Sequence, residues 1–146
     1  MSTTSQCSDS TSPWLLRETI CEPETWPLNA SLFALGNGYI GLRGRFEEEP
    51  TGCEGNYLNG VYHSEPIIYG EKAYGYARNN QQMVSVPNAK FIQLQIDGQW
   101  FSLQEGTVSD YERTLDMESG VLIRRLVWTS RTGKSVEIDI RRIVSL

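Results

Sequence analysis

Residues 33–44 read FALGNGYIGLRG, and this stretch contains the G-x-G-x-x-G spacing of nucleotide-binding loops at residues 36–41. In a dinucleotide-binding site the last glycine begins a helix whose amino terminus holds the pyrophosphate. Residues 42–46, LRGRF, instead alternate apolar with polar or small side chains, which predicts a strand. A kinase glycine loop does lie between strands, but it requires V-A-I-K and H-R-D sequences, and neither occurs. The stretch therefore indicates tight turns in a sheet rather than a nucleotide site.

The composition is that of an ordinary globular domain. The chain has 146 residues, of which 39% are hydrophobic and 21% charged, enough for one packed core. A net charge of -5 gives no attraction to nucleic acid or anionic lipid, so neither partner is expected. Residues 1–13 are rich in serine and threonine and lack the features of a signal peptide, which predicts a flexible tail. We expect a cytoplasmic protein with free thiols at Cys7, Cys21 and Cys53.

The hydrophobic pattern predicts an all-β fold built from antiparallel strands. No segment of ten residues has the apolar spacing of a helix, and Pro23 and Pro27 are expected to interrupt any regular element near them. Asp97 and Gly98 predict a two-residue hairpin turn, whereas residues 63–80 are expected to form an irregular loop. Strands are expected at residues 14–20, 42–46, 57–62, 91–96, 100–103, 121–127 and 136–140.

The charged residues are expected to be solvated rather than catalytic. A glycosidase needs a pair of carboxylates, which can come from any part of a sequence. Candidates are the glutamates at 47–49 with Glu65 and Glu71, but their composition favours a solvated turn and a solvated loop. The arginine pairs at 124–125 and 141–142 are expected to face the surface, as partners of Glu137 and Asp139.

Metal and nucleophile chemistry find little support. His63 is the only histidine, and no cysteine lies at a metal-ligand spacing from it, so no metal site is expected. A serine or cysteine triad would need the same histidine, and no G-x-S-x-G sequence occurs. The sequence therefore predicts no catalytic residue and no cofactor.

Tyrosines and asparagines are dense in the middle of the chain. Aromatic rings beside amides are typical of sugar sites, whereas tyrosines also pack commonly in sheets, so both interpretations stay open. The residues are Tyr57, Tyr62, Tyr69, Tyr74 and Tyr76, with Asn56, Asn59, Asn79 and Asn80 among them.

Several short sequences, in a consistent order, resemble the amino-terminal domain of glycoside hydrolase family 65. This family contains the maltose, trehalose, kojibiose and nigerose phosphorylases and some trehalose hydrolases. The resemblance runs from about residue 14 to residue 146. It includes FALGNGYIGLRG at 33–44, GNYLNGVY at 55–62, VPN at 86–88, IDG at 96–98, YERTLDM at 111–117 and WTS at 128–130.

The resemblance implies a β-super-sandwich followed by an (α/α)6 barrel, of which this chain holds only part of the sandwich, at residues 14–146. The family's general acid and phosphate-binding residues lie on the barrel, so no catalytic residue can be assigned here. The implied reaction inverts the anomeric centre, and inorganic phosphate is the co-substrate if the enzyme is a phosphorylase. Asn37 and Arg43 are the candidates for contact with the barrel or a sugar.

Three hypotheses follow. The chain is an amino-terminal fragment of an intracellular disaccharide phosphorylase or hydrolase and is inactive alone, with an α-linked glucose disaccharide as substrate and a homo-oligomer as the expected state. It is alternatively a carbohydrate-binding sandwich, or an oligomerisation module. The apolar residues 143–146 have no closing turn, so we expect a truncated piece with an open strand edge.

Overall fold

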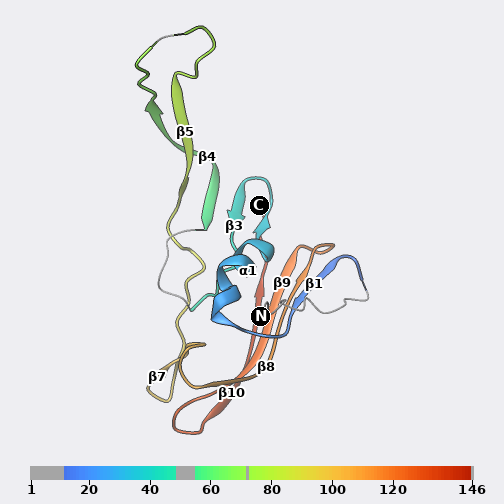
Figure 1. The fold of residues 1–146 in the computed structure, drawn as a ribbon. Helices are drawn as coiled ribbons and strands as arrows, with labels where there is room; N and C mark the ends of the chain where they lie inside the picture. The colour runs from blue at the N-terminus through green and yellow to red at the C-terminus, as the bar shows by residue number, and fades with distance from the viewer. Residues whose placement is uncertain (1–11, 49–54, 72, 146) are drawn as a thin grey trace, which may run out of the picture.

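The computed structural model describes residues 12–48, 55–71 and 73–145, and strands dominate it (Figure 1). Sheet A joins β1, β8, β9 and β10 in that order, sheet B joins β2 to β5, and β6 pairs with β7. All pairings are antiparallel, which confirms the all-β prediction. The strands are β1 Leu15–Glu18, β2 Leu35–Gly36, β3 Ile40–Leu42, β4 Asn56–Pro66, β5 Asn79–Ser85, β6 Gln95–Ile96, β7 Gln99–Trp100, β8 Thr107–Asp116, β9 Val121–Thr129 and β10 Ser135–Arg142.

The core lies on one face of sheet A, called here the inner face. Alternate residues of β8, β9 and β10 point to it, as the period of two in a half-buried strand requires. One cluster gathers Trp128 and Leu126 with Phe46 and Phe101, and a second gathers Phe33 with Leu122. Segments far apart in the sequence therefore converge on this face.

A short helix covers part of the core, which corrects the sequence prediction for this region. The 3-10 turn Pro23–Thr25 leads into α1, Trp26–Leu32, where no regular element was expected. Pro27 is tolerated because it lies in the first turn, where a backbone N–H has no intrahelical partner in any helix. Seven residues are also too few for helical periodicity to show.

Gly44 allows the chain after β3 to pass close to α1. Its N–H donates to the carbonyl of Ala30 at 2.7 Å, and a Cβ here would lie 2.6 Å from the Cβ and the carbonyl oxygen of Phe33. Strand β3 ends at Leu42, so the strand predicted over 42–46 is wrong beyond its first residue. The following residues cross the inner face of sheet A instead.

Two other predicted elements are confirmed with changed lengths. Asp97 and Gly98 have φ values of 53° and 79° and form the predicted turn, but β6 and β7 contain only two residues each. The irregular loop is shorter than predicted, because β4 continues to Pro66 and β5 begins at Asn79.

Beyond the bulge between Tyr57 and Tyr62, β4 and β5 continue as a two-stranded arm that projects away from sheet A (Figure 1). The name "arm" is used below for residues 61–71 and 73–84. Within the ranges that the structure describes, no helix is long and apolar enough to cross a membrane.

Candidate functional site

Three arginines lie on the inner face of sheet A, one on each of three neighbouring strands. They are Arg113 on β8, Arg124 on β9 and Arg142 on β10, and each has the strand parity of its apolar neighbours. Arg113 and Arg124 are directly opposite each other in the register of β8 and β9, and each is only 2% exposed. Two buried like charges at adjacent positions require carboxylates nearby.

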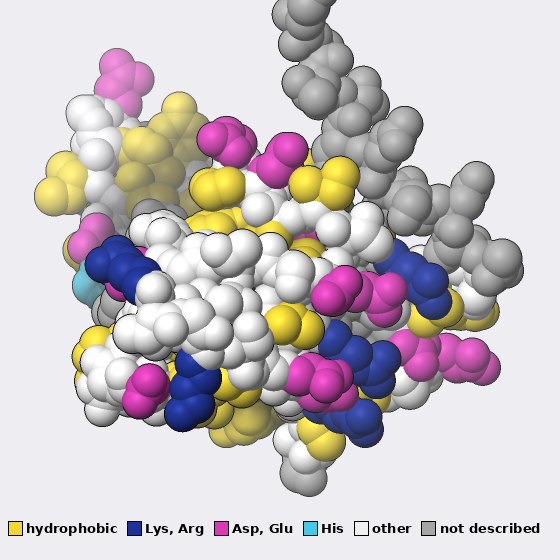
Figure 2. All heavy atoms as spheres, turned by 90° about the horizontal axis from the view of Figure 1, so that it is seen from below, with side chains coloured by type: hydrophobic (Ala, Val, Ile, Leu, Met, Phe, Trp, Pro, Cys, Tyr) yellow, Lys and Arg dark blue, Asp and Glu magenta, His cyan; other side chains and the backbone are white. Residues whose placement is uncertain are grey.

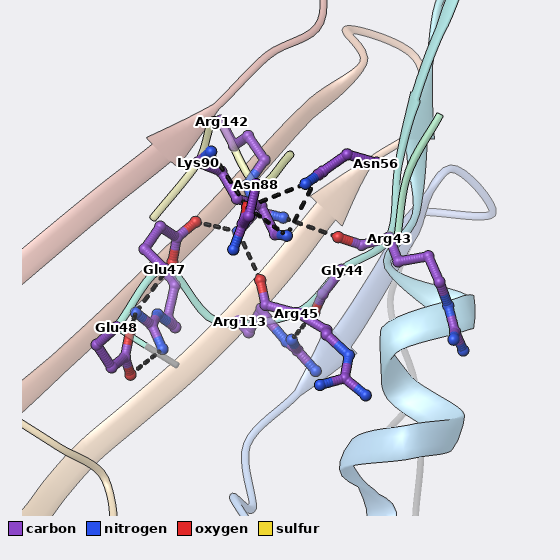
Figure 3. A network of polar contacts seen from close by, with 11 residues as sticks. Arg43, Gly44, Arg45, Glu47, Glu48, Asn56, Asn88, Lys90, Arg113 and Arg142 are labelled. Atoms are coloured by element: carbon purple, nitrogen blue, oxygen red, sulfur yellow. Dashed lines mark hydrogen bonds and ion pairs between the residues drawn. The ribbon is translucent and has the colours of Figure 1, made fainter. Parts of the chain in front are cut away.

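Two glutamates supply part of that charge. They belong to residues 43–48, which cross the inner face of sheet A and are called the crossing segment below. Glu48 accepts two hydrogen bonds from Arg124, at 2.8 Å and 2.5 Å, in the bidentate geometry that suits guanidinium and carboxylate. Glu47 accepts from Arg124 at 3.0 Å through one oxygen and from Arg142 through the other. Figure 3 shows Glu47, Glu48 and Arg142 together with Arg45, whose backbone carbonyl also accepts from Arg142.

These contacts overturn two expectations from the sequence. Glu47 and Glu48 are buried, each 8% exposed, and do not form a solvated turn, while Glu49 lies outside the described residues. Arg124 and Arg142 point inward rather than to the surface. The physical reason is the alternation of side chains along a strand. Residues two positions apart point to the same face, so an arginine in phase with the core residues points toward the core.

A third carboxylate neutralises Arg113. The Oε2 atom of Glu18 on β1 lies 2.7 Å from the Nε of Arg113 and also accepts a hydrogen bond from the hydroxyl of Tyr111 at 2.8 Å. The other oxygen of Glu18 accepts a hydrogen bond from the side-chain amide of Asn29 on α1. Arg113 also donates to the carbonyl of Gly44 at 2.8 Å. The ion pair therefore ties β1, α1 and the crossing segment to β8.

The ring of Phe46 contacts both of the opposed arginines. The guanidinium carbons of Arg113 and Arg124 are 4.8 Å and 4.6 Å from its centroid, and Arg113 is also 4.2 Å from the centroid of Phe33. An aromatic face attracts a cation electrostatically, and a buried contact of this kind stabilises by about 2 kcal/mol. The aromatic rings thus stabilise both buried guanidinium groups.

The charged groups of the inner face bind one another and are not exposed to a substrate. Burial alone would lower the pKa of Arg124, but the hydrogen bond and charge of Glu48 and the charge of Glu47 outweigh burial and raise it. Both oxygens of Glu18, of Glu47 and of Glu48 accept a hydrogen bond or ion pair. A general acid must present its carboxyl group to the scissile bond, and these buried groups do not.

The outer face of sheet A carries the charges that the sequence predicted correctly. Asp139 pairs with Arg125 at 3.1 Å and with Arg141 at 3.3 Å, and their hydrogen bonds lower the pKa of Asp139. From below, Lys and Arg side chains lie beside Asp and Glu side chains (Figure 2). That view shows charges of both signs intermixed.

Asn37 and Arg43, the two candidates from the sequence, are both engaged in local structure. The Oδ1 of Asn37 accepts from the N–H groups of Tyr39 and Ile40, at 2.9 Å and 2.7 Å, and closes the turn between β2 and β3. Arg43 donates to the Oγ of Ser31 at 2.6 Å, so it fastens α1 to the end of β3. Their contact with a barrel or a sugar stays a prediction.

A hollow of about 450 Å3 lies on sheet B, at the base of the arm. Tyr39 and Gly41 are the sequence neighbours of Ile40. Tyr57 and Asn59 are the sequence neighbours of the β4 residue that pairs with Ile40. Alternation therefore places these four residues on one face. The lining residues are Gly36, Gly38, Tyr39, Ile40, Gly41, Tyr57, Asn59 and Met83.

The structure divides the cluster of tyrosines and asparagines predicted from the sequence. Tyr57 and Asn59 line the hollow, whereas the rings of Tyr69 and Tyr76 contact each other on the arm at 4.8 Å. Asn56 is buried and donates to Asn88 at 3.1 Å (Figure 3). The sequence did not single out Tyr39 as a candidate for sugar binding, although Tyr39 lies within the glycine-rich stretch at residues 33–44.

Metal ligands do not gather in the described ranges, which hold no group of three or more His, Cys, Asp or Glu side chains placed to bind an ion. His63 lies 2.6 Å from Glu65 on the arm, and both are exposed. Cys21 is a free thiol, and burial raises its pKa, whereas Cys7 and Cys53 lie outside the described residues.

Comparison with known proteins identifies a family and relatives that this chain resembles. The model of "Glycosyl hydrolase family 65, N-terminal domain" matches residues 16–146. An alpha,alpha-trehalose phosphorylase of Thermoanaerobacter brockii is 44% identical over 138 residues, covering 91% of this chain and 18% of the relative. A kojibiose phosphorylase of Escherichia coli is 36% identical over 136 residues, covering 92% of this chain and 16% of the relative.

A solved structure agrees. A putative kojibiose phosphorylase from the human microbiome has a TM-score of 0.74 and 26% identity, over 92% of this chain and 18% of that chain. The chain thus spans less than a fifth of the length of the relatives that it matches. Because the family model covers nearly all of it, this chain belongs to glycosyl hydrolase family 65 and corresponds to its N-terminal domain.

Proposed function

We propose that this chain is the amino-terminal domain of an enzyme that cleaves α-linked glucose disaccharides of the trehalose, kojibiose or maltose type. The supporting observation is the family match over residues 16–146, together with relatives named as phosphorylases of these three sugars. The domain in this proposal is residues 14–146, preceded by a tail at residues 1–13.

The proposed reaction inverts the anomeric centre. A general acid protonates the glycosidic oxygen while phosphate, or water in a hydrolase, attacks the opposite face of the sugar. Inorganic phosphate is a co-substrate in the first case, and the proposal includes no resident cofactor. The choice between phosphate and water belongs to residues of a catalytic barrel domain, which is the partner proposed for this chain.

The geometry of the inner face supports a structural role for the domain. Its three buried carboxylates are fully engaged with Arg113, Arg124, Arg142 and their neighbours, so none is placed to protonate a glycosidic oxygen. We therefore expect the 146-residue chain to be inactive alone. Its contribution would be a rigid sandwich beside the catalytic domain.

The test compares the chain with the polypeptide encoded by its complete reading frame. We expect the longer protein to release glucose 1-phosphate from maltose, kojibiose or trehalose when phosphate is added, or glucose when water attacks. The 146-residue chain should release neither. Activity of the chain alone, or a full-length protein that cleaves none of the three sugars, would overturn the proposal.

Two further properties belong to the proposal. We place the full-length enzyme in the cytoplasm and expect a homo-oligomer, which cell fractionation and light scattering would test. A second candidate function, a carbohydrate-binding sandwich, is favoured by the hollow on sheet B, whose lining combines two tyrosine rings with an amide.

A further inference from the structure

Gly41 in the floor of the hollow is a glycine that the fold itself does not require. Its φ lies outside the left-handed region, and a Cβ at this position would meet no atom within 4 Å. In contrast, Gly38 has a φ of 85°, and Gly44 has no room for a side chain. A glycine inside a strand weakens it by roughly 0.5–1 kcal/mol, and it often marks the close approach of a ligand.

The walls around Gly41 combine flat rings with polar groups. Tyr57 is directly opposite Gly41 in the register of β3 and β4, so the missing side chain leaves open space beside its ring. Tyr39 is half exposed, and its carbonyl accepts the N–H of Asn59 at 2.8 Å, which fixes the two side by side. Among the described residues, neither tyrosine hydroxyl has a hydrogen-bond partner.

The lining narrows the class of ligand. It contains no charged side chain, so the hollow has nothing to pair with a phosphate or a carboxylate. A pyranose ring offers an apolar C–H face to an aromatic ring and hydroxyls to phenol and amide groups, which is the combination present here. An apolar peptide segment would leave the two hydroxyls without a role, and the Asn59 amide, which donates to the carbonyl of Gly38 and accepts from the hydroxyl of Tyr62, keeps a second N–H for a ligand.

We propose that this hollow is a binding site for one pyranose ring of a neutral glucose disaccharide, stacked between Tyr39 and Tyr57 above Gly41. The inference rests on the proposed function only for the choice of sugar. It adds a site on the amino-terminal domain itself, with Asn59 as hydrogen-bonding partner and the open side of Gly41 as the space for the ring.

The experiment is a titration of the isotope-labelled 146-residue chain, followed by NMR. Maltose, trehalose and kojibiose are each added up to about 50 mM, because a shallow open site is expected to bind with a roughly millimolar dissociation constant. We expect saturable shifts of the Gly41 and Tyr57 amide signals and of the Asn59 side-chain amide with at least one sugar. Sorbitol, which has hydroxyls but no pyranose ring, should cause no such shifts.

Matched variants locate the site. Gly41→Val fills the hollow and should weaken binding by about tenfold or more. Gly70→Val is the control, because Gly70 also has an ordinary φ and open space but lies on the arm. Tyr39→Ala should weaken binding without changing the spectrum of the core.

Three results of the sugar titration would overturn the inference. They are the lack of a shift with all three sugars, equal shifts with sorbitol, and unchanged binding by Gly41→Val. Signals of the hollow that move with protein concentration before sugar is added would show a second copy in it and would also overturn the proposal. None of these results bears on the cleavage assay of the full-length protein, so the two proposals can fail separately.

Discussion

The inner face of sheet A and the arm reverse the usual distribution of residue types. Arg113 and Arg124 are 2% exposed at the centre of the fold, whereas Ile68 and Tyr74 on the arm are 93% and 107% exposed. The difference shows that burial here depends on partners rather than on hydrophobicity. Both arginines are buried because carboxylates and aromatic rings contact them, whereas the apolar side chains of Ile68 and Tyr74 stay almost fully exposed.

The comparison also separates what stabilises the domain from what it presents to others. On the inner face, three arginines balance three glutamates, and the contacts join β1, α1, the crossing segment and sheet A. On sheet B, side chains point outward around the hollow and along the arm. Changes on the inner face should therefore affect stability, and changes on the arm should not.

The largest effect is expected from Arg124→Met. This change leaves Glu47 and Glu48 buried without their shared partner, and breaking a buried ion pair costs about 3–5 kcal/mol of the free energy of unfolding. Urea denaturation measures it. Arg125→Met is the matched control, because the neighbouring Arg125 is half exposed and should change stability far less. Equal effects of the two variants would contradict the inward placement of Arg124.

The second prediction concerns the close contact under α1. Gly44→Ala places a Cβ 2.6 Å from the Cβ and the carbonyl oxygen of Phe33 and 2.7 Å from its carbonyl carbon, so the helix must shift. Overpacking of this kind costs about 3 kcal/mol. Gly41→Ala, where the added Cβ meets nothing within 4 Å, is the control and should leave the denaturation midpoint unchanged or slightly raised. A tolerated Gly44→Ala would show that α1 is not held as closely as described.

The sequence predicts β9 and β10 well because alternation in these strands is a local signal, as is the turn chemistry at Asp97, but no strand was predicted at β8. It fails for the charge network because ion pairing joins residues far apart, such as Glu48 and Arg124. Parity offered a partial signal, since Arg124 alternates in phase with Leu122 and Leu126. Composition at residues 47–49 instead favoured a solvated turn, and nothing local revealed its arginine partners.

The hollow could be predicted only in part. Tyr57 and Asn59 were recognised as residue types that suit a sugar, but the distinction between Tyr57 in the hollow and Tyr69 on the arm depends on the length of β4. Helix α1 was missed because seven residues carry too little periodicity against two prolines. These elements are set by tertiary contacts, which a local pattern does not contain.

The third prediction tests the polar edge of the inner face by pH. Burial raises the pKa of Tyr111 above its ordinary value of 10.0, while Arg113 opposes this and Glu18 and Cys21 add to it. Because the folded-state pKa is raised, the stability due to the neutral phenol is complete below about pH 10 and is lost as the pH rises further. Tyr111→Phe should lower stability at pH 7 by about 1.5 kcal/mol, through loss of the bond to Glu18.

The informative quantity is the difference between the two proteins across the alkaline range. Unfolding free energies of wild type and Tyr111→Phe should stay apart up to about pH 10 and converge above it, since only wild type can lose a phenolic proton at this position. The exposed Tyr74→Phe should run parallel to wild type at every pH. Parallel curves for Tyr111→Phe would show that its hydroxyl is not buried in the folded state.

The smallest effect is expected on the arm, and it is the sharpest test of the contrast with the inner face. Ile68 and Tyr74 lie in the segment between β4 and β5 and bury almost no surface, so the double change Ile68→Ser and Tyr74→Ser removes no packing from the folded chain. We expect the same urea midpoint and the same slope as wild type, measured at two protein concentrations that differ by about tenfold. If wild type is more stable than the variant only at the higher concentration, the arm is buried between copies, because self-association stabilises a folded state by mass action. A loss of stability that is equal at both concentrations would instead mean that these side chains pack within their own chain, and the arm would then belong to the core that it has been contrasted with.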